Sequence, residues 1–278
     1  VAPATKSMTK ISLSIIILSY NVKQKLLDCL ASIPKHPDWE VLVVDNASTD
    51  GSDKLAHITS KTNIGFAAGN NLGIRRTKGE YILLLNSDTI VYSKTIETVL
   101  EYMQTHPDVG VATCRVELPD GTLDYSCHRK FPDPVGSFLH LIGLKQISSY
   151  TNQKIPNSIH EIDALTGAFA LIRREAGEQV NWLDEDYFFN GEDIDFCYKL
   201  KEAGWKVMYI PNVKITHHKL SSVKSSPASR KRWVTDSTNA MRIFYSKHLS
   251  QKYPFFVNWT VYLGIWLLRV ARLLTSNL

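Results

Sequence analysis

The segment EYILLLNSD, residues 80–88, runs from an uninterrupted apolar stretch straight into a carboxylate. Three consecutive leucines, residues 83–85, predict a β-strand buried on both faces, because a half-exposed strand would alternate apolar and polar side chains. Asn86 and Asp88 follow at once. Because burying an unpaired carboxylate is costly, Asp88 indicates either a turn at the surface or a polar crevice at the end of the strand.

Segments of the same kind recur along the first half of the chain. Further apolar strands are predicted at residues 12–20 (SLSIIILSY), 40–46 (EVLVVDN) and 109–118 (VGVATCRVEL). Helices are expected between the strands at residues 22–33, after the cap residues STDGS (48–52), and at residues 63–77 and 93–105. Apolar strands joined by helices predict an α/β fold, in which helices cover both faces of a mostly parallel sheet.

Polar side chains stand at the ends of three of these strands. The first strand ends in Ser19, Tyr20 and Asn21, the second in Asp45 and Asn46, and the third in Asn86, Ser87 and Asp88. Ligands of open α/β sheets bind beyond the carboxyl ends of the strands, so the three ends are expected to line one crevice. This placement favours a functional role for Asp88 over a simple turn.

A second cluster of acids opens a helix that is predicted from about residue 192. Glu192, Asp193 and Asp195 stand in its first turn, where the helix dipole favours negative charge. Three acids in four positions exceed what a helix start needs, and like charges so close raise one another's pKa. One of them is therefore a candidate general base, and another is a candidate hydrogen-bond partner.

Two histidines follow the last predicted strand, in the segment KITHH, residues 214–218. Adjacent side chains on a strand face opposite ways, so only one of His217 and His218 can face the crevice. A histidine beside Asp88 would form an oxygen and nitrogen site for a hard divalent cation such as Mg²⁺ or Mn²⁺. A purely structural histidine is the alternative.

The middle of the chain is less regular. Prolines interrupt residues 119–159, where a weak helix is expected at residues 137–144. We interpret this stretch as an insertion over the sheet that shapes a second substrate site. The strand after it contains Gly167 and Ala168, two small residues that mark a close approach to the backbone, by a ligand or by a packed neighbour.

These segments together resemble glycosyltransferase family 2, the inverting GT-A enzymes, and within it the rhamnosyltransferase-like branch. The matching motifs are IIILSYN (15–21), VVDNASTDGS (43–52), NIGFAAGNNLGI (63–74), LLLNSDT (83–89), LTGAFALIRRE (165–175), FFNGEDIDFCYKLKEAGW (188–205) and ITHH (215–218). Each motif is weak alone, but seven in the family's order are specific. The resemblance covers roughly residues 11–218 and matches the insertion and the residues after Lys219 poorly.

For the donor, the resemblance implies a set of nucleotide-sugar contacts at the strand ends. It implies that Ser19, Tyr20 and Asn21 line the base, that Asp45, beside Asn46, hydrogen-bonds the base ring, and that Asn63 and Asn70 lie near the ribose and the sugar. Asn86, Ser87 and Asp88 occupy the place of the family's DxD element. Its first acid is an amide here, which leaves Asp88 as the main metal carboxylate.

For catalysis, the resemblance implies one divalent cation and one base. His217 matches the family's metal-binding histidine, and the pair Glu192 and Asp193 matches the segment with the catalytic base, a role that we assign to Asp193. Gly167, Ala168 and Asp195 are expected at the acceptor. A cation on Asp88 neutralises the leaving nucleoside diphosphate, while Asp193 removes the acceptor's proton, so that a single displacement inverts the anomeric centre.

Composition adds limits on the class of protein. Hydrophobic residues make up 44% of the 278 positions, which predicts a sizeable core. Four cysteines lack a CxxC pair, which indicates a reduced, cytoplasmic chain without a zinc site or disulfide framework. Residues 1–10 are expected to be a leader or a cloning scar. Residues 11–218 would form the GT-A domain, with a donor half (11–118) and an acceptor half (119–218).

The last segment, residues 219–278, is expected to be a helical extension. Between Lys214 and Lys252 nine lysines or arginines accompany a single acid, which favours phosphates or anionic lipid headgroups over a merely solvated face. The apolar stretch that follows is too short and interrupted for a membrane span. Its tryptophans and arginines favour a helix at the cytoplasmic membrane surface. Packing on the domain, or on a second subunit in a homodimer, is the alternative.

The resulting hypothesis is an inverting enzyme of bacterial cell-surface polysaccharide synthesis that moves rhamnose from dTDP-rhamnose to a lipid-linked glycan. A UDP-hexose or UDP-galactofuranose transferase is the alternative within the class. A non-catalytic protein that binds nucleotides or nucleic acid is the alternative of another class. No helix-turn-helix or RNP-like string supports nucleic-acid binding, and no GxGxxG follows the first strand, which disfavours a dehydrogenase.

Overall fold

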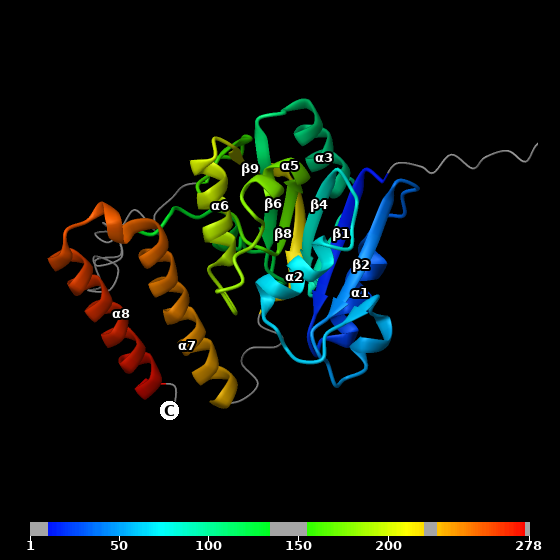
Figure 1. Ribbon diagram of the computed structural model, residues 1–278. Helices are drawn as coiled ribbons and strands as arrows, with labels where there is room; N and C mark the ends of the chain where they lie inside the picture. The colour runs from blue at the N-terminus through cyan, green and yellow to red at the C-terminus, as the bar shows by residue number, and fades with distance from the viewer. Residues whose placement is uncertain (1–10, 134–154, 220–226, 276–278) are drawn as a thin grey trace, which may run out of the picture.

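The computed structural model of the protein describes residues 11–133, 155–219 and 227–275. The leader expected at residues 1–10 and the weak helix expected at residues 137–144 lie outside these residues. Figure 1 shows a twisted sheet with helices packed around it and a pair of long helices standing to one side.

One sheet organises the described part of the chain. Its strands are β1 (Leu13–Ser19), β2 (Trp39–Asp45), β3 (Ile58–Thr59), β4 (Tyr81–Asn86), β5 (Thr89–Val91), β6 (Val109–Glu117), β7 (His160–Glu161), β8 (Phe169–Arg173) and β9 (Lys206–His217). Their order is β3-β2-β1-β4-β8-β6-β9-β5, and β7 pairs with β9. The predicted parallel pairing is confirmed for β3, β2, β1 and β4 and for β6 with β9. Strand β8 begins at Phe169, directly after the small residues Gly167 and Ala168 that were expected inside it, and it runs antiparallel to both β4 and β6.

Helices alternate with the strands, as the sequence pattern predicts. They are α1 (Lys23–Ser32), α2 (Phe66–Ile74), α3 (Thr95–Thr105), α5 (Arg174–Gln179) and α6 (Glu192–Glu202), with the 3₁₀ turns η1 (Ser52–Leu55) and η2 (Tyr125–Cys127). The cap residues STDGS open only the short turn η1. The carboxylate of Asp50 accepts hydrogen bonds from the backbone N–H of Ser52 (3.0 Å) and of Lys23 (2.8 Å), which joins this turn to the start of α1.

The C-terminal hairpin, residues 227–275, forms the predicted helical extension. Helix α7 (Pro227–Phe244) continues through a π-helical turn, η3 (Tyr245–Leu249), and a 3₁₀ turn, η4 (Ser250–Lys252), into α8 (Phe255–Thr275). Both overall views place α7 between the sheet domain and α8. In the part of the chain that the structure describes, no helix has the length and apolar character required to cross a bilayer.

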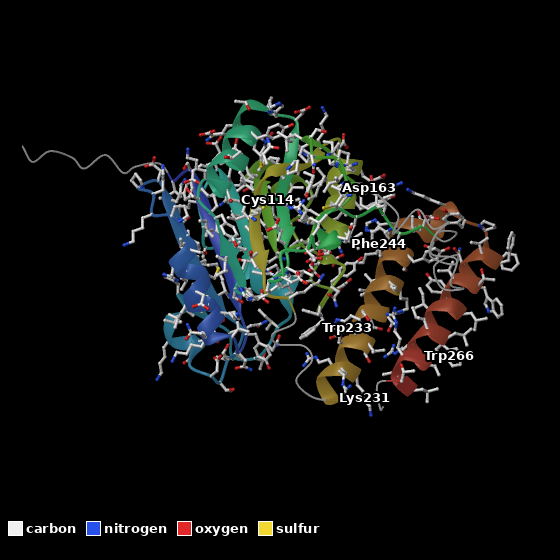
Figure 2. The ribbon with its side chains drawn as sticks, turned by 180° about the vertical axis from the view of Figure 1, so that it is seen from behind. Cys114, Asp163, Lys231, Trp233, Phe244 and Trp266 are labelled. Carbon is white, nitrogen blue, oxygen red and sulfur yellow. The ribbon has the colours of Figure 1, made fainter. Side chains whose placement is uncertain are left out.

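The core lies between the sheet and its helices. The leucines of β4, the isoleucines of β1 and the valines of β2 are buried in one continuous cluster. All four cysteines are free and buried in it, which agrees with the absence of a disulfide framework. A second, small cluster joins Tyr187 to Ala240 and Phe244 of α7, and it attaches the C-terminal hairpin to the sheet domain (Figure 2).

Two glycines let α2 approach the sheet closely. A Cβ atom on Gly73 would lie 2.6 Å from Ile16 Cγ2 and 3.1 Å from Val44 Cγ2, and one on Gly69 would lie 2.5 Å from Leu18 Cδ1. These neighbours are short branched side chains inside a packed core, so they cannot swing away. The glycines therefore fix the distance between α2 and the strands whose ends carry the polar residues.

The same substitution at two helical glycines should change stability in opposite directions. Gly73→Ala should lower the free energy of unfolding by about 1–3 kcal/mol, because the added methyl overpacks the core. Gly264→Ala in α8, where a Cβ would meet no atom within 4 Å, should stabilise its helix by about 0.5–1 kcal/mol. Urea unfolding followed by circular dichroism measures both. Equal effects would show that the contact between α2 and the sheet is not close packed.

Candidate active site

The carboxyl ends of β2, β1 and β4 meet at one edge of the sheet. In the strand register, Ser19 lies opposite Asp45 on one side, and Leu18 lies opposite Asn86 on the other. The expectation that three polar strand ends adjoin is therefore confirmed. Residues that are separated by 26 and 68 positions in the chain become direct neighbours because parallel strands end at the same edge.

Two buried polar atoms at this edge lack a partner within the described residues. The side chains of Ser19 and Asp45 are fully buried. One oxygen of Asp45, Oδ2, accepts a hydrogen bond from Ser48 N at 2.9 Å, whereas Asp45 Oδ1 and Ser19 Oγ have no hydrogen-bond partner. Since buried polar groups are normally paired, these two atoms are suited to a ligand that presents N–H or hydroxyl groups.

Asn46 organises the loop that leads into α2. Its side-chain amide donates to Asn63 Oδ1 (3.0 Å) and to the carbonyl of Gly65 (3.1 Å), and its oxygen accepts from the N–H of Ile64 (2.9 Å). The side chain of Asn70 is buried and donates to the carbonyl of Phe66 within α2. Asn46 therefore shapes the wall beside Asp45, and the roles of Asn63 and Asn70 at a sugar stay predictions.

Asn21 and Tyr20 lie at the rim of the same wall. Asn21 adopts a positive φ of 53°, its N–H donates to Ser48 Oγ, and its side-chain oxygen accepts from Thr49 N. These bonds hold the turn that follows Asp45. The ring of Tyr20 is 39% exposed, so it is available to cover a planar ligand, and its predicted role as a base contact stays a prediction.

Asp88 lies beside His217 at the end of β4. The pairing of β5 with β9 sets Thr89 opposite His217, and His217 Nε2 lies 3.2 Å from Asp88 Oδ1 and 3.3 Å from the side-chain nitrogen of Asn86. The neighbouring Ser87 is largely buried. His217 is buried, and His218 instead meets Lys25 Nζ at 3.1 Å. The prediction that only one of the two histidines faces this site is confirmed.

A second carboxylate, Asp124, stands on the far side of His217, and the sequence pattern did not reveal it. Its Oδ2 lies 3.6 Å from His217 Nδ1, and its Oδ1 lies 2.9 Å from Lys219 Nζ. Burial alone would lower the pKa of His217, but the carboxylates of Asp124 and Asp88 raise it to about 9. Burial opposes ionisation of Asp124, yet His217 and Lys219 hold its pKa well below the usual range.

This arrangement fits a divalent cation between Asp88 and His217 Nε2. A cation there would replace the positive charge of the imidazolium, and Nδ1–H would face Asp124, as carboxylates commonly face metal-bound histidines. Among residues 11–133, 155–219 and 227–275, no three His, Cys, Asp or Glu side chains already converge as a ligand set. Water and substrate phosphates would complete the coordination, as is usual for Mg²⁺.

Asp193 lies in the first turn of α6, after a turn in which Asn190 and Gly191 have φ of 64° and 91°. Its Oδ2 accepts hydrogen bonds from Arg129 Nη2 (2.6 Å) and from Gly167 N (3.3 Å), and its Oδ1 accepts one from the N–H of Ile194. Arg129 was not among the predicted residues, and its place in the irregular segment HRK, residues 128–130, offers no spacing signal.

The dipeptide Gly167-Ala168 connects Asp193 to the end of β4, next to Asp88. The N–H of Gly167 donates to Asp193, and the next carbonyl, that of Ala168, accepts from the N–H of Asn86 at 3.1 Å. The predicted close approach at this point is made by Phe66, whose Cζ would lie 3.2 Å from a Cβ on Gly167. Asp193 and Asp88 are therefore held on the same rim of the sheet.

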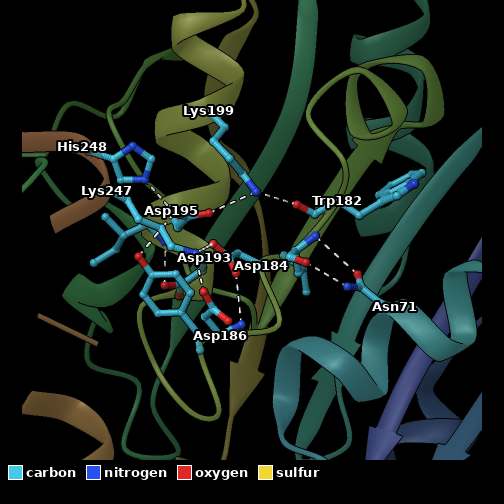
Figure 3. A network of polar contacts seen from close by, with 12 residues as sticks. Asn71, Trp182, Asp184, Asp186, Asp193, Asp195, Lys199, Lys247 and His248 are labelled. Atoms are coloured by element: carbon cyan, nitrogen blue, oxygen red, sulfur yellow. Dashed lines mark hydrogen bonds and ion pairs between the residues drawn. The ribbon is translucent and has the colours of Figure 1, made fainter. Parts of the chain in front are cut away.

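The other two acids of α6 differ from Asp193 in their surroundings. Glu192 is buried, its Oε2 has no partner among the described residues, and burial together with the neighbouring Asp193 raises its pKa. Asp195 is fully buried among Tyr187, Lys199 and His248. Burial opposes its ionisation, but His248 and Lys199 lower its pKa. Its carboxylate faces the C-terminal hairpin (Figure 3). The expected contact of Asp195 with an acceptor stays a prediction.

Comparisons with known proteins agree on one enzyme class. The model of the family described as glycosyl transferase family 2 matches residues 14–181. The N-acetylglucosaminyl-diphospho-decaprenol L-rhamnosyltransferase of Mycobacterium tuberculosis H37Rv is 26% identical over 244 residues, which cover 78% of this chain and 79% of the relative. Rhamnosyltransferase WbbL of Escherichia coli K12 is 29% identical over 248 residues, which cover 81% of this chain and 90% of the relative.

Solved structures share the fold at low identity. The mannosyltransferase PcManGT from Pyrobaculum calidifontis, in complex with GDP-Man and Mn²⁺, has a TM-score of 0.59 at 17% identity and aligns with 97% of this chain and 74% of its own. The S. aureus protein TarS, residues 1–349, in complex with UDP, has a TM-score of 0.56 at 16% identity, over 87% of this chain and 68% of its own.

Removing the carboxylate behind His217 should weaken cation binding. Asp124→Asn should lower the affinity for Mn²⁺ by about 10–100-fold, because the imidazole loses the acceptor that orients it. Titration of the protein with Mn²⁺ in the presence of dTDP, followed by electron paramagnetic resonance, measures this affinity without turnover. Asp120→Asn, the same change at an exposed loop residue four positions earlier, is the control. Equal affinities in the two variants would exclude an orienting role for Asp124.

Proposed function

The chain belongs to glycosyl transferase family 2 and has the GT-A fold, and from this premise we propose that it transfers rhamnose from dTDP-rhamnose to a lipid-linked glycan with inversion. The similarity to two rhamnosyltransferases over about four-fifths of the chain supports the sugar. The mycobacterial relative, an N-acetylglucosaminyl-diphospho-decaprenol L-rhamnosyltransferase, supports the lipid-linked acceptor. In this proposal, the enzyme takes part in the synthesis of a bacterial cell-surface polysaccharide.

One observation carries the chemistry of this proposal. The backbone of Gly167 and Ala168 joins Asp193 to the end of β4, which supports a proton acceptor on the same side of the sheet as the proposed cation site at Asp88 and His217. Transfer from a nucleotide sugar requires both groups near one anomeric carbon. When bound, Mg²⁺ or Mn²⁺ supplies charge neutralisation for the departing nucleoside diphosphate.

The remaining steps belong to the side chains. Asp45 Oδ1 accepts a hydrogen bond from the base of the nucleotide, and the hydroxyl of Ser19 donates one to it. The ring of Tyr20 covers the face of the base. Arg129 and the N–H of Gly167 fix Asp193 Oδ2, and Oδ1 retains a lone pair for the acceptor hydroxyl. Asp193 takes the proton of this hydroxyl as it attacks. Glu192, whose surroundings favour the neutral carboxylic acid, is unsuited to accept it.

The C-terminal hairpin supports a place for the enzyme on the cytoplasmic face of the cell membrane. The outward face of α8 is apolar along its length, with exposed side chains at helical spacing: Phe255, Phe256, Trp259, Tyr262, Leu263, Trp266 and Leu267. A continuous exposed apolar face of this kind marks an interaction site. We assign it to a lipid surface, because aromatic residues next to basic ones suit the headgroup boundary.

Charge supports the same occupant. Arg230 and Lys231 are exposed in the first turns of α7. Figure 2 shows Lys231 at the end of the hairpin where α8 terminates, and Trp266 on the neighbouring helix α8. Each basic residue near an anionic surface contributes roughly 1 kcal/mol of attraction. An acceptor that stays in the bilayer would then be presented to an enzyme held on the same surface.

Removal of the base should abolish transfer but keep the donor. Asp193→Asn should lower kcat by up to about 10⁴-fold, because the amide cannot accept the proton of the acceptor hydroxyl. Transfer from dTDP-rhamnose to an N-acetylglucosaminyl diphosphate with a short alkyl chain measures kcat, and calorimetry measures dTDP binding. Glu202→Gln at the exposed end of the same helix is the control. Near-normal turnover of Asp193→Asn would assign the base elsewhere.

Polar replacements on α8 should release the protein from lipid. Trp259→Gln with Trp266→Gln changes two side chains that are 65% and 57% exposed, so folding should be preserved. Flotation with phosphatidylglycerol vesicles should fall relative to the wild type and to Leu27→Gln, a control on exposed α1. A chain that ends at Tyr253 should behave in the same way. Flotation that persists, or a dimer that becomes a monomer, would identify the face as a subunit contact.

A further inference from the structure

The segment that contains the base, residues 184–195, is held from two sides. On the donor side, the N–H of Phe66 at the start of α2 donates to the carbonyl of Phe188 at 2.8 Å. On the other side, the guanidinium of Arg232 lies 4.3 Å from the centroid of the Phe188 ring. A Cβ atom on Gly191 would lie 3.0 Å from Ala240 Cβ. Helix α7 therefore packs directly on the turn that opens α6.

The π-helical turn η3 adds polar contacts to both ends of this segment (Figure 3). Lys247 Nζ forms ion pairs with Asp184 and, at 2.7 Å, with Asp186. The next residue, His248, places Nε2 at 2.6 Å from Asp195 Oδ1. π-Helical turns are rare in proteins, and those that occur are often found at functional sites. Here two consecutive side chains of the turn reach the beginning and the end of the segment that carries Asp193.

The contact with His248 is made in a buried place. The carboxylate of Asp195 is fully buried, and the side chain of His248 is 13% exposed. Without His248, this carboxylate would keep only Lys199 at 3.1 Å and the hydroxyl of Tyr187 at 3.3 Å. A buried charge that loses a partner is strongly unfavourable, so the first turns of α6 would shift to find another one.

The contact between the C-terminal hairpin and α6 lies beside two hollows. One of about 690 Å³ is lined by residues of α5, α6, η3 and η4, and one of about 230 Å³ lies between the Tyr187 loop and α7. At this contact, the rings of Tyr198, Phe244 and His248 form an aromatic cluster with centroids 4.5–5.5 Å apart. The polar contacts of η3 adjoin this cluster. These side chains connect the turn that precedes α8 with α6.

We propose that Lys247 and His248 are positioning residues, which hold the Asp193 segment in register and make the catalytic base and the lipid-binding helix α8 one mechanical unit. The proposal rests on the proposed function, since it names how that active site is assembled on a membrane. Asp193 and Asp195 share one helical turn, so a bond that fixes Asp195 also fixes Asp193. Docking of α8 on lipid thereby restrains the loop that contacts the donor side through Phe188.

The test compares two replacements of one side chain in the full-length chain. His248→Ala removes the contact with Asp195, and His248→Gln restores a donor of similar reach. With dTDP-rhamnose and the short-chain acceptor, His248→Ala should lower kcat by about 100-fold, the effect of misplacing a catalytic group by about 1 Å. The KM for dTDP-rhamnose should stay within about twofold, because Asp45 and Asp88 are untouched. His248→Gln should recover most of kcat. Lys247→Ala and Lys247→Arg form a second pair with the same expectation.

A second measurement decides the coupling without turnover. Hydrogen–deuterium exchange of residues 184–195 should slow when phosphatidylglycerol vesicles are added to the wild type, and it should not slow in His248→Ala. If neither the wild type nor any variant transferred rhamnose, while vesicles still slowed the exchange of residues 184–195 in the wild type, the proposed function would be overturned and the positioning role would stand. Equal kcat in wild type and His248→Ala would overturn the positioning role. Loss of donor binding in both His248 variants, or no vesicle protection in the wild type, would overturn it as well.

Discussion

The pairing of β1 with β2 and β4 is the constraint on which the rest of this structure depends. Three apolar strands lie in parallel register, so their carboxyl ends reach the same edge. The interior of these strands is mostly apolar, and most of their polar side chains stand where the strands end. Glycines on α2 keep the helix close enough for this packing. The positions of Asp45, Asn86 and Asp88 follow from that arrangement, and the small residues Gly167 and Ala168, directly before β8, connect Asp193 to this edge.

The acids of this site are separated in role by what surrounds them. Asp45 has one oxygen bound by the backbone and one free, which suits a ligand contact. Asp88 faces an imidazole whose other nitrogen points to Asp124, and Lys219 adds a second positive charge beside Asp124. On α6, one carboxylate is held by Arg129, the preceding one is buried where the neutral acid is favoured, and the one two residues later is tied to His248. Environment, rather than residue type, distinguishes these groups.

The C-terminal hairpin belongs to the active site as much as to the surface. Its outward side, on α8, is apolar and aromatic. On its inward side, Ala240, Phe244 and His248 contact the loop and helix that contain the proposed base. The expected extension is thus confirmed as helical, and its inner contacts are specific. A hairpin that only bound lipid would need no buried contact with Asp195 of α6. The presence of one is the reason to treat membrane docking and base placement as linked.

The sequence by itself determined the long strands, most of the helices between them, the polar strand ends, the order of the motifs and the apolar character of α8, because each depends on residues near one another in the chain. It did not predict the short strands β3, β5 and β7, and the helix expected after STDGS is only the 3₁₀ turn η1. Only the tertiary structure placed Asp124 behind His217, Arg129 against Asp193 and His248 against Asp195, and turned β8 antiparallel. These pairs are 93, 64 and 53 positions apart. No periodicity links such partners, since side chains that distant meet only when the packing of the whole sheet and hairpin brings their elements together.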